Sequence, residues 1–154
     1  QDTQPAAPVE QSAPTTPKTY SSFTGTNYDP YHTAQNRPDS KKEDIGKGAS
    51  GIFIDDSMAA TSLKKDGITG NLRMGTVIWV PELKKKFLIA DTMNKRFNGQ
   101  NKIDLATPHT GSEIIPAYNK NFDIVVLREG KGAEDARNLV NSGEWDNIKR
   151  MSVD

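Results

Sequence analysis

The chain has 154 residues, no cysteine, and equal numbers of basic and acidic side chains, 20 of each. This length allows one domain of ordinary size with tails, and it is too short for two full hydrophobic cores. A net charge of zero and a pI near 7 give no electrostatic argument for binding nucleic acid or anionic lipid. The lack of cysteine excludes disulfides, thiolate metal sites and a cysteine nucleophile within this sequence.

The first 22 residues are rich in proline, threonine, serine, alanine and glutamine. Such a composition buries too little apolar surface to offset the entropy of ordering, so residues 1–22 are predicted to be a disordered tether that is dispensable for folding. The chain begins with Gln1, which indicates a processed or truncated N-terminus with any signal peptide removed. No apolar run approaches the roughly 20 residues of a membrane span. We therefore expect a secreted, periplasmic or cell-envelope protein.

The predicted folded domain covers residues 23–130. We expect a short strand over residues 20–26, followed by a long polar surface loop. Residues 52–54 fit another short strand, and residues 58–62 fit either a strand or a helical turn. The two histidines, His32 and His109, lie far apart in sequence and are predicted to be loop residues, so no metal site and no cofactor are expected.

The second half of the domain has clearer strand signals. Residues 75–80 are dense in β-branched and aromatic side chains and end at Pro81, and residues 82–86 read as a hairpin turn. Residues 87–90 return as a strand that ends on Asp91. A later strand contains Asp104, and residues 121–127 form the last one. Beyond residue 130, helical spacing over 133–140 and 144–151 predicts a helical extension, 131–154, packed outside the strands or against a partner.

Asp104 is an unusual residue for its position, because strands are depleted in aspartate and it stands between Ile103 and Leu105. If Asp91 and Asp104 lie at one end of the sheet, two acids are offered to one cleft, and their titrations should be coupled, with one pKa raised at the expense of the other. The alternative is that Asp104 points to solvent and Asp91 opens a turn by bonding its own backbone.

The order of motifs resembles the three-aspartate (3D) domain, a small six-stranded double-psi β-barrel of bacterial cell-envelope proteins. Its fold relatives include the lytic transglycosylase A and rare-lipoprotein-A groups. The resemblance runs over residues 23–127, and its motifs are Gly75-Thr-Val-Ile-Trp-Val-Pro81, Ala90-Asp-Thr-Met-Asn94, Phe97-Asn-Gly99 and Lys102-Ile-Asp-Leu105. A weaker match, Gly48-Ala-Ser-Gly51, resembles a stretch that leads into the second strand of that family. The resemblance implies a mainly β fold in which the last strand closes the barrel.

The resemblance also implies an activity, cleavage of peptidoglycan glycan strands or another β-1,4-linked glycan by lytic transglycosylation. In that reaction Asp104 would act as general acid and then base, with Asp91 as its electrostatic partner. The residues expected to bind substrate are Thr92, Asn94, Lys102, Trp79 and Tyr28, and the aromatic side chains available for stacking on a sugar are Trp79 and Phe97.

The sequence departs from the family pattern at the first of the three aspartates, where Thr61 or Ser62 stands in place of the acid. Asp66, in an insertion before residue 75, is a candidate to replace it in space. The missing acid keeps a second function open, a non-catalytic glycan-binding or structural barrel whose aspartates hold rim loops by accepting backbone N–H bonds.

Overall fold

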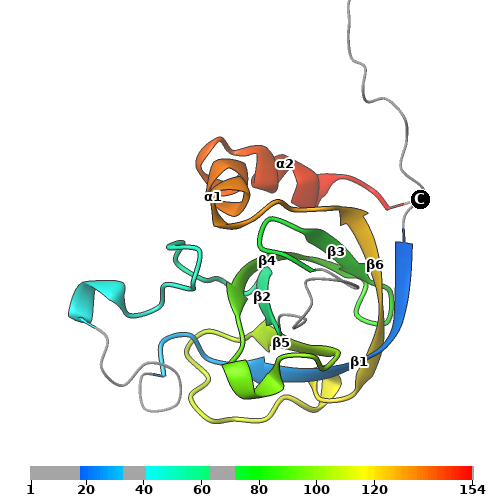
Figure 1. Cartoon of the computed structure of the whole chain (residues 1–154), viewed down its shortest axis with the longest axis horizontal. Coiled ribbons are helices and arrows are strands. Elements are labelled where there is room, and N and C mark those ends of the chain that lie inside the picture. Colours follow the sequence, from blue (N-terminus) through cyan, green and yellow to red (C-terminus); the bar gives the residue numbers. More distant parts are fainter. Residues whose placement is uncertain (1–17, 33–40, 63–71, 154) are drawn as a thin grey trace, which may run out of the picture.

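The computed structural model describes residues 18–32, 41–62 and 72–153, which form one barrel with two helices beside it (Figure 1). The strands are β1 (Lys18–Tyr28), β2 (Met58–Thr61), β3 (Val77–Val80), β4 (Lys85–Thr92), β5 (Lys102–Ala106) and β6 (Asn121–Arg128). The helices are α1 (Ala133–Asn141) and α2 (Glu144–Arg150). In this part of the chain no helix is long and apolar enough to cross a membrane.

The six strands close into a barrel in the order β1, β5, β2, β4, β3, β6. Two pairs are parallel, β1 with β5 and β2 with β4, and the other four are antiparallel. Exchanging β1 with β4, β2 with β5 and β3 with β6 leaves the set of strand pairs unchanged. The two halves of the barrel are therefore related by a pseudo-twofold axis, and each half pairs with the other. This confirms the predicted mainly β fold, a six-stranded double-psi barrel with short C-terminal helices.

Several element boundaries differ from the predictions. β1 begins at Lys18 and pairs with β6 from that residue, so the expected tether boundary at residue 22 falls inside a strand. Residues 1–17 lie outside the described part of the chain. The strand predicted over residues 52–54 is wrong, because Phe53 makes only an isolated bridge to Lys47. Residues 58–61 are a strand rather than a helical turn. The predicted turn at 82–86 is shorter than expected, since β4 already starts at Lys85.

The barrel interior is filled by alternate apolar side chains of all six strands, including Phe23, Ile89, Ile103, Leu105 and Phe122. Alternation along each strand places the intervening side chains on the outer face. Closure of the barrel leaves no unpaired sheet edge, which removes a common route to aggregation.

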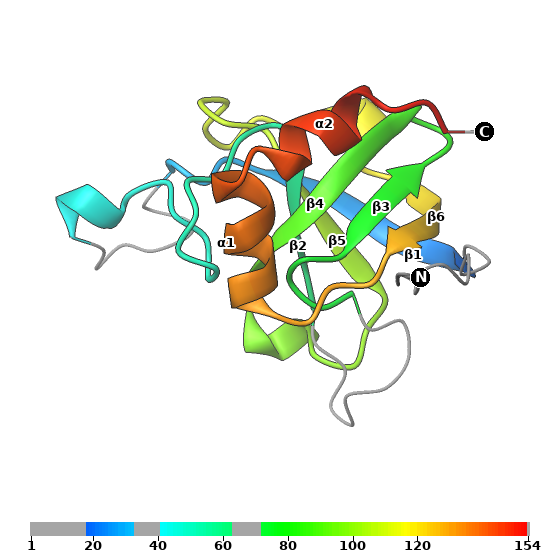
Figure 2. The ribbon, with the colours of Figure 1, turned by 90° about the horizontal axis from the view of Figure 1, so that it is seen from above.

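A second apolar cluster lies outside the barrel, where α1 and α2 cover β4 (Figure 2). Leu139 and Trp145 of the helices pack there against Leu88 of β4, and the Trp145 indole N–H donates to the Ser57 hydroxyl at 3.1 Å. The helical extension therefore packs on the outside of the barrel. Apolar side chains whose helical spacing is visible in the sequence make this contact.

Two further contacts fix the outer layer. The Lys86 side chain is only 8% exposed, and its ammonium donates to the carbonyls of Ile148 at 2.6 Å and Met151 at the end of α2. Gly130, which precedes α1, lies so close to the chain before β3 that an added Cβ would be 2.2 Å from the backbone nitrogen of Thr76. A larger residue than glycine at position 130 does not fit.

Candidate functional site

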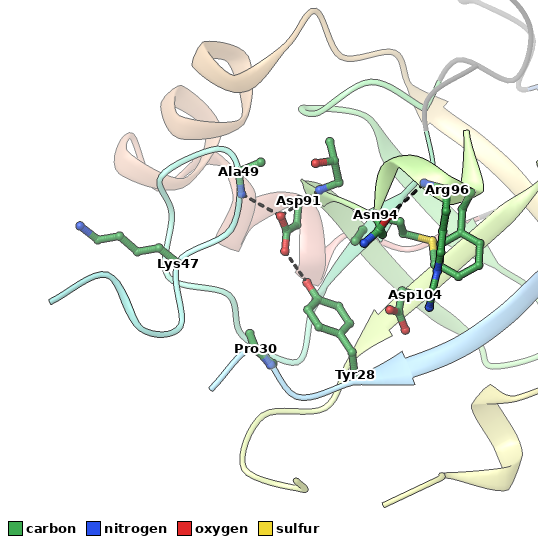
Figure 3. Close-up of a pocket in the computed structure, with 12 residues that line it drawn as sticks. Tyr28, Pro30, Lys47, Ala49, Asp91, Asn94, Arg96 and Asp104 are labelled. Atoms are coloured by element: carbon green, nitrogen blue, oxygen red, sulfur yellow. Dashed lines mark hydrogen bonds between the residues drawn. The ribbon is translucent and has the colours of Figure 1, made fainter. Parts of the chain in front are cut away.

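An open cleft of about 450 Å³ is lined by both Asp91 and Asp104 (Figure 3). Its other walls come from the end of β1, from β2, and from two loops, one around Lys47 and Ala49 and the other over residues 92–97. The two acids predicted to meet at one cleft therefore do so.

The strand register explains why the acids face the same way. Thr26 of β1 pairs with Asp104 of β5, Asp104 pairs with Ala60 of β2, and Ala60 pairs with Asp91 of β4. Residues directly opposite one another on adjacent strands point to the same face of the sheet. The four residues thus form one row on the outer face, with the small side chain of Ala60 between the two acids.

A β-bulge is needed to bring Asp91 into this row. The pairing of β2 with β4 shifts by one residue after Ala59, so that Ala59 pairs with Ile89 and Ala60 pairs with Asp91. In a regular ladder Ala60 would face Ala90, and Asp91 would point to the barrel interior, because a one-residue shift reverses the direction of every following side chain.

Asp104 is partly buried, and its carboxylate accepts a hydrogen bond from the Thr26 hydroxyl at 2.8 Å. The pKa of Asp104 is raised from 3.8 to about 6. Burial is the largest cause and the charge of Asp91 also raises the pKa, whereas the Thr26 hydrogen bond and Lys102 act to lower it. The carboxyl can therefore hold or release a proton near neutral pH. The expected raised pKa is present, but desolvation rather than coupling to Asp91 is its main cause.

Asp91 is held by three donors. Its Oδ1 accepts from the backbone N–H of Ala49 at 2.7 Å and of Thr92 at 2.9 Å, and its Oδ2 accepts from the Tyr28 hydroxyl at 3.0 Å. Burial, with the charges of Asp91 and Asp104, raises the pKa of Tyr28 well above its usual value, so the phenol stays protonated and donates. Asp91 is a fixed negative charge at the cleft. It also accepts backbone N–H bonds, as expected if the aspartates hold the rim loops.

The loop that supplies the Ala49 N–H depends on a glycine. An added Cβ at Gly48 would lie 2.8 Å from the Ala90 carbonyl and 2.9 Å from the Asp91 carboxyl carbon. The loop is also tied to α1, because the Arg137 guanidinium donates to the Ser50 carbonyl at 2.8 Å. The glycine-containing stretch over residues 48–51 was the only sequence signal for this donor.

The other predicted binding residues have different positions. Thr92 and Asn94 line the cleft, and Asn94 Oδ1 accepts from the Arg96 N–H at 2.9 Å, which caps the 3-10 helix Lys95–Phe97. Tyr28 lines the cleft as predicted. Trp79 does not line the cleft. It lies on β3, which pairs with β4 and β6, so β4 separates it from Ala60 of β2.

Lys102 is not part of the cleft wall. Its ammonium lies 5.0 Å from the centre of the Phe97 ring, and Phe97 does line the cleft. Two cationic residues at the cleft, Lys47 and Arg96, were not predicted from the sequence. Neither lies in a recognisable motif, so only the folded chain brings them to the site.

Among the described residues, the wall where the first family aspartate was expected carries no acid. Thr61 is buried and its hydroxyl donates to the Leu72 carbonyl at 2.9 Å, and the Ser62 hydroxyl donates to the Gln100 carbonyl. The residue of β2 that lines the cleft is Ala60. Asp66, the proposed substitute, lies outside the described residues.

Across residues 18–32, 41–62 and 72–153, no group of three or more His, Asp or Glu side chains is placed to hold a metal ion. No protein-family model matches the chain, and a search of curated proteins also finds no match. Membership of the three-aspartate family accordingly stays a prediction based on the motifs and on the barrel.

Proposed function

We propose that this protein is a glycan-cleaving enzyme of the bacterial cell envelope that cuts peptidoglycan, or another β-1,4-linked glycan, by lytic transglycosylation. The observation that carries the proposal is the Asp104 carboxyl, which has a pKa of about 6 and lines an open cleft beside a second, fixed carboxylate. An acid that protonates a leaving oxygen near neutral pH needs a raised pKa of this kind.

The reaction uses one carboxyl group twice. Asp104 donates its proton to the glycosidic oxygen, the bond from that oxygen to C1 breaks, and the oxygen leaves as a hydroxyl. The 6-hydroxyl of the same sugar attacks C1, and its proton returns to the Asp104 carboxylate as the 1,6-anhydro bond forms. No water is consumed, and the enzyme ends the cycle with Asp104 protonated again.

Asp91 stabilises the positive charge that develops on the sugar ring. Three hydrogen bonds fix its orientation before substrate binds, so little reorganisation is needed during the reaction. Ala60 leaves space between the two acids, where a sugar ring can approach both carboxyl groups.

The second candidate is a barrel that binds glycan without cleaving it. One observation favours this candidate. The β2 residue that lines the cleft is Ala60, whereas the three-aspartate family is expected to carry its first acid on this wall. In that case Asp91 and Asp104 serve only to hold the rim.

The test is the release of 1,6-anhydro products from purified peptidoglycan, measured by mass spectrometry for the parent and for Asp104→Asn. Loss of the general acid should lower the rate by about a hundredfold or more. Asp56→Asn is the matched control, because Asp56 is exposed and away from the cleft, and it should retain the parent rate.

Equal rates in Asp104→Asn and the parent would remove Asp104 from the mechanism. A parent protein that binds β-1,4-linked glycan but releases no anhydro product would favour the binding barrel instead.

A further inference from the structure

Two cationic side chains lie near one aromatic ring that lines the cleft. The guanidinium of Arg96 lies 4.6 Å from the centre of the Phe97 ring, and the ammonium of Lys102 lies 5.0 Å from it. Both distances fall within the range in which a cation is attracted to the face of an aromatic ring. The Phe97 ring thus contacts two cationic side chains.

Neither cation forms an ion pair with any residue in the described part of the chain. Arg96 is exposed and lines the cleft, and Figure 3 shows its side chain on the same side of the cleft as Asp104. The carboxylates that face the cleft are already engaged, Asp91 by three donors and Asp104 by Thr26.

Arg96 lines the cleft, is exposed, and has its guanidinium placed over the Phe97 ring, so it presents a positive charge to whatever the cleft binds. A guanidinium binds a planar carboxylate through two parallel N–H bonds, which makes arginine well suited to recognise that group. Lys102 already acts on the charge of Asp104, whereas Arg96 forms no ion pair with the described residues, so an anionic group of a ligand is the natural partner for Arg96.

We propose that the Arg96 end of the cleft is a subsite for a carboxylate carried on a sugar of the glycan, with Arg96 as the specificity-determining residue and Lys102 in support. The inference rests on the proposed function in one respect, that a glycan occupies this cleft. The carboxylate has two possible sources, an acidic ether substituent on the sugar or a carboxylate on the sugar ring itself.

The test measures binding and so does not depend on cleavage. Three oligosaccharides of equal length are titrated by calorimetry into Asp104→Asn protein: a neutral β-1,4-linked N-acetylglucosamine oligomer, one with lactyl ether carboxylates on alternate sugars, and one with ring carboxylates on alternate sugars. We expect at least one acidic oligomer to bind about tenfold tighter than the neutral one, as a charge-assisted bidentate contact would provide.

Adding Arg96→Gln to this protein should abolish the preference, and adding Lys102→Gln should reduce it. Lys95→Gln is the matched control, because Lys95 is an exposed cation on the same 3-10 helix but does not line the cleft. It should keep the preference. The preference should also weaken at higher salt.

Tighter binding of only the lactyl or only the ring-acid oligomer identifies the source of the carboxylate. Equal binding of neutral and acidic oligomers, a preference that survives Arg96→Gln, or no binding of any of the three would overturn the inference. Cleavage by the parent protein without a preference for acidic glycan would leave the proposed function standing. A preference without cleavage would leave this subsite standing and remove the enzymatic proposal.

Discussion

Replacing Asp104 with asparagine should make the protein more stable at pH 8 and change its stability little at pH 4. The pKa of Asp104 is raised to about 6 in the folded protein, mainly by burial, against an ordinary value of 3.8. The folded state therefore binds more protons than the unfolded state between these values. The stability that this carboxyl contributes is fully present below pH 3.8 and is lost as the pH rises through about 6.

The size of the effect follows from the difference between the two pKa values, which corresponds to about 3 kcal/mol of lost stability at pH 8. Asparagine has nearly the same shape, can accept the hydrogen bond from Thr26, and carries no charge to be desolvated. Its amide N–H groups need partners of their own, so we expect a net gain of about 2 kcal/mol.

The assay is urea unfolding at five pH values from 4 to 8, with the m-value checked for constancy at each. Asp56→Asn is the control for the change in net charge, because Asp56 is exposed. A loss of stability at pH 8, or a difference that is the same at every pH, would refute the argument that burial of Asp104 is costly. A control variant with the same pH-dependent gain would also refute it.

Asp91→Asn should lower the pKa of Asp104 only in part, since burial is the larger cause, and carbon-13 NMR titration of the carboxyl groups measures this. Lys86→Met should weaken attachment of α2 and cost about 1–3 kcal/mol in urea unfolding. Gly130→Ala should give little folded protein on expression, judged by circular dichroism, because its methyl group meets backbone atoms. Deletion of residues 1–22 should lower the melting temperature by about 5 °C or more, since five of them belong to β1.

Much of the fold follows from local sequence patterns. The last strand, predicted over residues 121–127, is β6 (Asn121–Arg128), and both C-terminal helices have the apolar spacing expected of a helix with one covered face. The prediction failed at residues 52–54, where apolar side chains are buried from a loop rather than from a strand. A short apolar run cannot by itself distinguish these two cases.

The candidate site was predictable in part. Asp104 stood out because a carboxylate inside an apolar strand conflicts with strand propensity. The bulge that turns Asp91 into the cleft has no sequence signature, because it depends on how β4 pairs with a strand about 30 residues earlier. The positions of Arg96, which lines the cleft, and of Trp79, which does not, also have no local sequence signature, because they depend on the closed strand order.

The contacts of α1 reach beyond the apolar cluster that it covers. Arg137 holds the Ser50 carbonyl, and the neighbouring Ala49 N–H holds Asp91, so a helix outside the barrel supports a charge inside the cleft. α1 and α2 also cover the apolar outer face of β4, the strand that ends on Asp91.

Helices and barrel should consequently behave as a single cooperative unit in hydrogen exchange, with the amides of α1 and β4 opening together. A cut at residue 130 would not release an intact barrel, because it would expose Leu88 and Ala90 to water and free the loop that orients Asp91. The C-terminal segment is thus a structural part of the cleft, although it contributes no residue to its wall.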